Sequence, residues 1–121
     1  MVIRLEGKVA LITGAARGLG ESIARLFAKH GARVVIADIL DDLGKSVCED
    51  MGLEVASFIH CDVSVESNIE NAVNATVDKY GKLDVMVNNA GILDQPKSSI
   101  IDNDASDFER VIKVNVAGTS L

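Results

Sequence analysis

VALITGAARGLG, residues 9–20, is the stretch that decides the fold of this chain. It opens with the apolar run Val9–Ile12, spaces three glycines as Gly-x-x-x-Gly-x-Gly, and leads into an amphipathic segment that reaches His30. Glycine lets a backbone approach an anion closely, and the N–H groups at a helix start point toward it. The stretch therefore predicts a strand, a turn and a helix that cradle the pyrophosphate of a dinucleotide. The residues expected to contact that cofactor are Thr13, Gly14, Arg17, Gly18, Leu19 and Gly20.

The three glycines also have two other interpretations. An ordinary tight turn accommodates a glycine triplet, and only its place between a strand and a helix favours a cofactor. A P-loop is excluded, because no Lys-Ser or Lys-Thr pair follows Gly20.

Apolar runs and helical patterns alternate along the rest of the chain. The runs are rich in Val and Ile and mostly lack strict alternation, which is typical of strands buried on both faces of a parallel sheet. They lie at Val9–Ile12, Val34–Ala37, Val55–Ile59 and Leu83–Val87. Helical spacing between the runs, with right-handed crossovers, predicts an α/β fold: a doubly wound parallel sheet with helices on both faces.

The boundaries of the expected helices are marked by polar and glycine residues. Gly31 is expected to stop the first helix, Ser64 to cap the start of the third, and Gly81 to follow its end.

A fourth helix is expected to begin near Asp104. Its apolar face would carry Phe108, Val111 and Ile112, and Asn115 shares that face. A polar amide on a core face needs partners, so Asn115 is either a satisfied core asparagine or a group aimed at a site.

The totals limit the class of protein. The chain has 121 residues, enough for one domain, with 48% apolar residues and a net charge of −6 without a basic run. Such an acidic chain is unsuited to nucleic acid and to anionic membrane surfaces. Cys48 and Cys61 have no metal-binding or redox spacing, and we expect them to be reduced core residues of a cytoplasmic protein.

Asp38 ends the second expected strand, 18 positions after Gly20. An acidic residue at this place accepts hydrogen bonds from the adenosine ribose and repels a 2′-phosphate, so NAD is expected rather than NADP. Ile39 is expected to contact the same part of the cofactor. Arg17 argues the other way, since an arginine can accommodate a 2′-phosphate. A turn or capping aspartate is the alternative for Asp38, although Asp41 is better placed for that task.

Polar residues also follow the third and fourth expected strands. Asp62 can accept from the adenine amino group and Val63 can wall the ring, although Asp62 also fits a simple turn. The tetrapeptide Asn88–Gly91 pairs two amides, which need partners at a buried strand end, with two small residues that let backbone lie against a flat ligand. Its residues expected at the cofactor are Asn89, Ala90 and Gly91.

Together these motifs resemble the short-chain dehydrogenase/reductase family, in its order and spacing and over essentially the whole chain. The residues that carry the resemblance are Thr13-Gly14-x-x-x-Gly18-x-Gly20, Asp38, Asp62-Val63, Asn88-Asn89-Ala90-Gly91 and Asn115-x-x-Gly118. The stretch Phe58–Val63 resembles the family members of plant secondary metabolism.

The resemblance implies a Rossmann-like sheet, here of about four strands in the order 3-2-1-4. It implies a nicotinamide cofactor across the strand ends and hydride transfer to or from a secondary alcohol or ketone, in an enzyme that forms homo-oligomers. It implies that Thr13 and Asn88 brace the cofactor loops, and that Asn115 serves catalysis by holding a water in a proton relay.

The family's catalytic Tyr-x-x-x-Lys does not occur in these 121 residues: the only tyrosine, Tyr80, is followed four positions on by Asp84. We therefore expect residues 1–121 to be the NAD-binding part of a single Rossmann domain, incomplete at its C-terminus, inactive alone, and with Val85–Val87 as an open sheet edge. A non-catalytic dinucleotide-binding module and a truncated partner of intact subunits are the alternatives.

Overall fold

Strands and helices alternate through the described part of the chain, which in the computed structural model is residues 4–89 and the backbone of 113–116. The elements are β1 (Val9–Thr13), α1 (Gly18–Lys29), β2 (Arg33–Asp38), α2 (Asp41–Met51), β3 (Ala56–His60), α3 (Glu66–Tyr80), β4 (Val85–Asn88) and β5 (Lys113–Val116). Each of the four expected apolar runs forms a strand, so the predicted alternation is confirmed.

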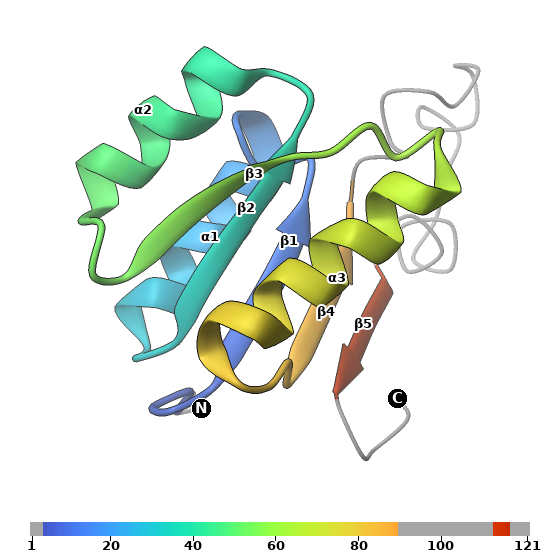
Figure 1. The fold of residues 1–121 in the computed structure, drawn as a ribbon. Coiled ribbons are helices and arrows are strands. Elements are labelled where there is room, and N and C mark those ends of the chain that lie inside the picture. Colours follow the sequence, from blue (N-terminus) through green and yellow to red (C-terminus); the bar gives the residue numbers. More distant parts are fainter. Residues whose placement is uncertain (1–3, 90–112, 117–121) are drawn as a thin grey trace, which may run out of the picture.

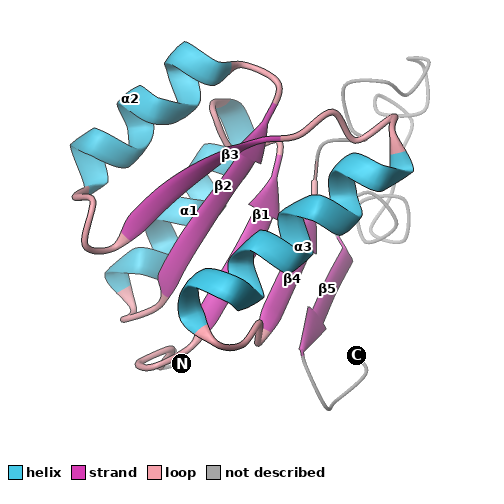
Figure 2. Cartoon of the chain, viewed as in Figure 1, coloured by secondary structure: helices cyan, strands magenta, loops and turns pink. Residues whose placement is uncertain are grey.

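The sheet has the strand order β3-β2-β1-β4-β5. β1 to β4 are parallel to one another, which confirms the expected order 3-2-1-4. Helices α1 and α2 cover one face of the sheet and α3 covers the other (Figures 1 and 2). The carboxyl ends of the parallel strands meet at the upper edge in Figure 1, where ligands of doubly wound sheets bind.

The core has two layers because successive strand residues face opposite sides of the sheet. On the side of α1 and α2, Ile12 and Ile36 are fully buried and pack in one cluster with Val47 of α2. On the side of α3, Leu11 is fully buried and packs with Ala72 of that helix. Burial on both faces explains why the strands read as continuous apolar runs.

β5 corrects two expectations drawn from the sequence. Residues Lys113–Val116 form a strand antiparallel to β4, with Val85 opposite Val116 and Val87 opposite Val114, so Asn115 lies on a strand and not on a helix. Alternating β-branched residues favour a strand here, and pairing satisfies the backbone groups that β4 would otherwise leave open. Val85–Val87 is therefore not an open sheet edge. The earlier part of the expected fourth helix lies outside the described residues.

Two of the three expected helix boundaries are confirmed. Gly31 follows α1 with a φ of 103°, and Gly81 follows α3 with a φ of 82°, a region that favours glycine. Ser64 is not the N-cap of α3: Val65 is, and the Ser64 hydroxyl instead donates to Asp62 Oδ1 at 2.6 Å. This short hydrogen bond to a charged carboxylate holds the Ser64 side chain in the turn before α3.

Candidate functional site

The glycine loop joins β1 to α1 at the carboxyl edge of the sheet. Gly14 and Gly18 have φ values of 67° and 63°, in the left-handed region where a side chain is strained. Arg17 between them is the extended N-cap of α1, and its side chain makes no cap hydrogen bond. The first N–H groups of a helix have no carbonyl of their own helix to bond, so the start of α1 offers donors to an anion.

Gly20 lets the first turn of α1 lie directly against the loop. A Cβ atom at this position would stand 2.2 Å from the Gly14 carbonyl oxygen and 2.5 Å from Asn89 Nδ2. Such distances are far inside van der Waals contact, and the first of them is to fixed backbone. Gly18 differs, because a Cβ atom there would meet nothing within 4 Å among the described residues.

Asp38 is the last residue of β2 and lies at this edge. Its side chain is buried, with 8% of the residue exposed. Oδ2 accepts the Ala16 backbone N–H at 3.0 Å, and Oδ1 accepts the Leu40 backbone N–H at 3.0 Å. The carboxylate therefore ties the glycine loop to the β2–α2 turn, a contact that sequence reasoning did not foresee.

Three further residues expected at the cofactor surround these backbone groups with exposed side chains. Leu19 is exposed on the first turn of α1, and Ile39, in the β2–α2 turn, is 53% exposed. Arg17 is exposed and forms no ion pair within residues 4–89. The edge thus presents two exposed apolar side chains and Arg17, a cation without an ion-pair partner among the described residues.

Asp62 and Val63 follow β3 at the same edge. Asp62 Oδ1 accepts both the hydroxyl of Ser64, at 2.6 Å, and its backbone N–H, at 3.0 Å. These hydrogen bonds to the charged form lower the pKa of Asp62. Val63 packs partly against the core cluster under α3. The turn interpretation of Asp62 is thereby borne out in geometry, and its Oδ2 makes no hydrogen bond to another described residue.

Thr13, Asn88 and Asn89 join the end of β4 to the glycine loop. The Thr13 hydroxyl accepts the Asn89 backbone N–H at 2.9 Å and lies 3.1 Å from Asn88 Oδ1, to which it donates. Asn89 Nδ2 donates to the Gly14 carbonyl at 3.3 Å. Asn89 Oδ1 is buried and has no hydrogen-bond partner among the described residues. Thr13 thereby links the ends of β1 and β4, and the bracing of the cofactor loops that the resemblance implies for Thr13 and Asn88 stays a prediction.

The remaining expected site residues are only partly placed. Ala90 and Gly91 lie outside the described residues. Asn115 is opposite Met86 in the β4–β5 pair, as a strand residue. Tyr80 ends α3, and its hydroxyl lies 3.2 Å from Ser57 Oγ near the start of β3, away from the carboxyl edge. The structure therefore places Tyr80 away from the carboxyl edge of the sheet.

His60, the last residue of β3, lies at the same edge, and no motif of the sequence pointed to it as a site residue. Its Nδ1 lies 2.6 Å from Asp41 Oδ1, at the first residue of α2. The contact depends on the parallel register, which places His60 directly beside Asp38 and which no local sequence pattern reports.

The described residues hold no group of three His, Cys, Asp or Glu side chains suited to a metal ion. Cys48 and Cys61 are free and buried, as expected, and burial raises the pKa of Cys48 to about 11.

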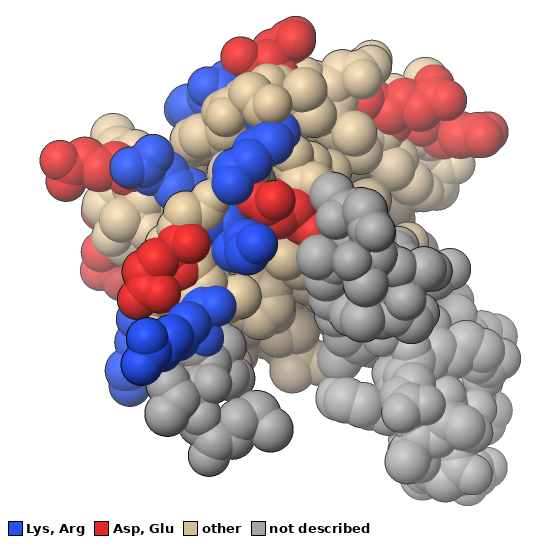
Figure 3. Space-filling view, turned by 90° about the horizontal axis from the view of Figure 1, so that it is seen from below, with Lys and Arg blue, Asp and Glu red and all other residues tan. Residues whose placement is uncertain are grey.

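No helix in the described ranges is long and apolar enough to cross a membrane. Figure 3, seen from below, shows Lys and Arg interspersed with Asp and Glu on that face.

Two known proteins of similar sequence are plant dehydrogenases. A mitochondrial borneol dehydrogenase from Lavandula x intermedia is 58% identical over 118 residues, which are 98% of this chain and 44% of that protein. A secoisolariciresinol dehydrogenase from Forsythia intermedia is also 58% identical over 118 residues, 98% of this chain and 43% of that protein. These relatives agree with the plant resemblance of Phe58–Val63, and the chain spans less than half of their length.

Solved structures share the same fold. The 3-ketoacyl-(acyl-carrier-protein) reductase from Brucella melitensis, complexed with NADH, superposes with a TM-score of 0.71 at 43% identity, over 88% of this chain and 43% of that one. A hydroxysteroid dehydrogenase from Escherichia coli gives a TM-score of 0.68 at 39% identity, over 71% of this chain and 37% of that one. The family described as short chain dehydrogenase matches residues 8–121. With its glycine loop, its strand order and these matches, the chain belongs to the short-chain dehydrogenase family.

Proposed function

We propose that this chain binds NAD across the carboxyl ends of β1 to β4, as the cofactor-binding part of an oxidoreductase. The whole enzyme would transfer a hydride between the nicotinamide and a small secondary alcohol or ketone. The dehydrogenase names of similar proteins, and the NADH in the Brucella melitensis reductase, favour this function over a non-catalytic dinucleotide-binding module or a truncated partner of intact subunits.

Asp38 is the observation that carries the choice of NAD over NADP. Its carboxylate is buried and oriented by two backbone N–H groups, yet each oxygen retains a lone pair for a ribose hydroxyl. A charge held in place beside a 2′-phosphate would repel it. Arg17 argues for NADP, because its exposed side chain forms no ion pair with an acidic residue in residues 4–89.

The residues present fit a dinucleotide. The glycine loop and the first N–H groups of α1 suit the pyrophosphate. Asp38 and Ile39 suit the adenosine ribose, and Asp62 and Val63 suit the adenine. Buried Asn89 Oδ1, without a partner in the described ranges, is an acceptor available at the β4 side. When bound, the nicotinamide would supply the site that accepts or donates the hydride.

Several finer points belong to this proposal. Ala90, Gly91 and Asn115 are assigned to the cofactor and proton-relay side of the site from the family resemblance alone. The 121 residues by themselves are expected to turn over no substrate, because Tyr80 is far from the carboxyl edge. A cytoplasmic location and a homo-oligomeric enzyme are likewise proposed, although one similar protein is named mitochondrial.

The test is a calorimetric titration of the purified protein with NAD and with NADP. The unchanged protein should bind NAD more tightly. Asp38→Ala should lower the preference for NAD, the ratio of the NADP to the NAD dissociation constant, by about five- to thirtyfold, the scale of a lost charge-assisted hydrogen bond. Asp38→Asn keeps an acceptor for one backbone N–H and should lower this ratio as well, because the charge is gone.

Asp42→Ala is the matched control. Asp42 carries the same charge in the first turn of α2 but is exposed, so its removal should leave the ratio of the two affinities unchanged. Tighter binding of NADP by the unchanged protein would overturn the choice of cofactor. Failure to bind either dinucleotide would overturn the proposed function itself.

A further inference from the structure

The contact between His60 and Asp41 closes the β2–α2 turn from the side of β3. His60 is the last residue of β3, and Asp41 is the first residue of α2. The 2.6 Å distance from Nδ1 to Oδ1 is short, as expected for a hydrogen bond to a charged acceptor. Because a carboxylate only accepts, His60 donates from Nδ1, which carries a hydrogen in the charged ring and in one neutral tautomer.

The turn that this contact closes is the one that orients Asp38. The turn is short, with only Ile39 and Leu40 between β2 and α2. At its beginning, Leu40 donates its backbone N–H to Asp38 Oδ1 at 3.0 Å. At its end, the Leu40 carbonyl accepts the Gly44 N–H at 2.9 Å and so begins α2. Leu40 therefore couples the position of α2 to the position of the Asp38 carboxylate.

The two strands that meet here are joined directly as well. In the parallel register His60 stands beside Asp38, and the next residue, Cys61, donates its backbone N–H to the Asp38 carbonyl at 2.9 Å. These backbone contacts hold the end of β3, which carries the His60 side chain, beside Asp38. The imidazole of His60 then contacts Asp41 at the start of α2.

We propose that His60 is a positioning residue for the adenosine end of the site: through Asp41 it holds the start of α2, and through Leu40 it holds the Asp38 carboxylate toward the ribose. This inference rests on the proposed binding of NAD. It assigns to His60 a share of the discrimination between NAD and NADP, without contact between the imidazole and the cofactor.

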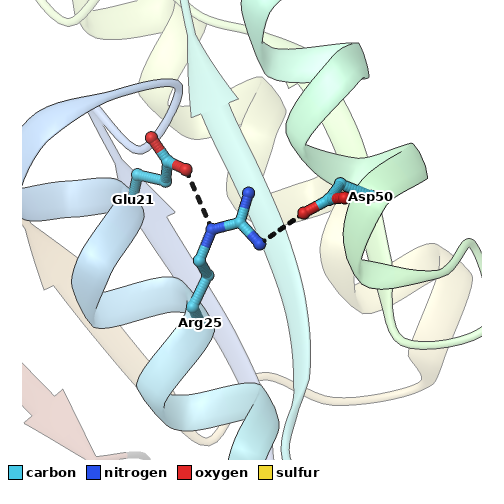
Figure 4. Close-up of polar contacts among 3 residues, drawn as sticks. All are labelled: Glu21, Arg25 and Asp50. Carbon is cyan, nitrogen blue, oxygen red and sulfur yellow. Dashed lines mark hydrogen bonds and ion pairs between the residues drawn. The ribbon is translucent and has the colours of Figure 1, made fainter.

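A competing explanation is that the pair merely adds stability at the surface, since both side chains are about half exposed. The chain offers a matched pair for comparison at the other end of α2. There Arg25 of α1 donates to Asp50 at 2.7 Å and to Glu21 at 2.8 Å (Figure 4). The His60–Asp41 and Arg25–Asp50 contacts each use an aspartate of α2, but only Asp41 is next to the β2–α2 turn.

The experiment is a double-mutant cycle of His60→Ala and Asp41→Ala, with Asp50→Ala as the control. For each protein, calorimetry gives the dissociation constants of NAD and NADP, and thermal unfolding reports stability. We expect either single change at the turn to weaken NAD binding about fivefold, with a smaller effect on NADP, because the lost contact is worth about one hydrogen bond. The double variant should be no weaker than the more affected single variant, since both changes break one contact.

His60→Asn tests the positioning directly, because its side-chain amide can place a donor close to the position of Nδ1. This variant should restore most of the NAD affinity that His60→Ala loses. Asp50→Ala should lower the unfolding temperature about as much as Asp41→Ala, yet leave the NAD to NADP ratio unchanged.

Each other outcome has a defined meaning. Additive effects of His60→Ala and Asp41→Ala would show two independent charge effects and would overturn the coupling. An unchanged NAD to NADP ratio in His60→Ala, with NAD still bound, would overturn the inference while leaving the proposed function intact. Absence of NAD binding in the unchanged protein would instead remove the proposed function on which the inference rests.

Discussion

The two halves of the candidate site differ in how their buried polar groups are satisfied. Between β1 and β2, both oxygens of Asp38 accept backbone N–H groups, and the Gly14 N–H donates to the Ala37 carbonyl at 2.8 Å. At the end of β4, Asn89 donates from Nδ2 to the Gly14 carbonyl, but its buried Oδ1 has no partner among the described residues.

The polar groups of the β1–β2 half are thus satisfied within that half, whereas the buried Asn89 Oδ1 of the β4 half needs a further hydrogen-bond donor. The β1–β2 half is built from consecutive strand–turn–helix segments, and the Asp38 carboxylate contacts residues no more than 22 positions away. The β4 half is attached to it by contacts across more than seventy positions, such as that of Asn89 with Thr13. A buried acceptor without a partner is costly, and a ligand or ordered water is the usual way of satisfying it.

The largest expected loss of stability comes from a substitution within the β1–β2 half. Gly20→Ala would place a Cβ atom 2.2 Å from the Gly14 carbonyl oxygen, which is backbone and cannot turn away. We expect a loss of about 3 kcal/mol in the free energy of unfolding, measured by urea denaturation, because overpacking moves the loop.

Gly18→Ala is the comparison for that change. Its Cβ atom would find open space, so only the positive φ of 63° is strained, at about 1 kcal/mol. Equal losses for the two variants would contradict the close approach of α1 to the loop.

A smaller effect should follow from uncoupling the two halves. Thr13→Val keeps the shape of the side chain but removes the hydroxyl that accepts the Asn89 N–H at 2.9 Å. The buried N–H would then lack its acceptor, at a cost of about 2 kcal/mol by chemical denaturation. Thr13→Ser retains the hydroxyl and should lose clearly less; if serine is as destabilising as valine, packing and not the hydrogen bond joins the halves.

The success of sequence reasoning follows the same division. The strands, the glycine loop and the place of Asp38 were predictable, because apolar runs and turn residues act within a few positions. Asn115 was misplaced on a helix, since the spacing of Val111, Ile112 and Asn115 fits a helical face while Lys113–Val116 also alternates as a strand does. The open edge of β4 decided in favour of a strand, and no local pattern reports that edge.

The contacts of Asp38 and His60 were beyond local patterns for a related reason. The Asp38 carboxylate reaches Ala16, and His60 reaches Asp41, only once the parallel register has brought their elements together. Ser64 shows the reverse case: the sequence suggested a helix cap, but its hydroxyl donates to Asp62 in the turn before α3.

The smallest expected loss of stability comes from a substitution of Asp84, which joins β4 to β1 at the opposite edge of the sheet. Partial burial acts to raise the pKa of Asp84, but the Val9 N–H, at 2.9 Å, and Lys82, at 3.0 Å, outweigh it, and the pKa is lowered from 3.8. A lowered folded pKa stabilises the protein above the ordinary carboxyl range, and the gain is lost as pH falls through the folded value.

Urea midpoints measured between pH 2.5 and pH 6 check this assignment. Asp84→Asn should cost about 0.5–1 kcal/mol near pH 6 and nothing at the acid end, so its pH profile is flatter than that of the unchanged protein. Parallel profiles would mean that other carboxylates account for the acid dependence. NAD binding should be unaffected, because this edge is remote from the glycine loop.

Nuclear magnetic resonance of the backbone amides would show where NAD binds. We expect NAD to shift the amide signals of Gly14–Gly20, of Asp38–Leu40 and of Asp62–Val63, while those of Lys82 and Asp84 at the other edge stay in place. Shifts confined to the edge of Lys82 and Asp84, or no shift in the glycine loop at saturating NAD, would contradict this expectation.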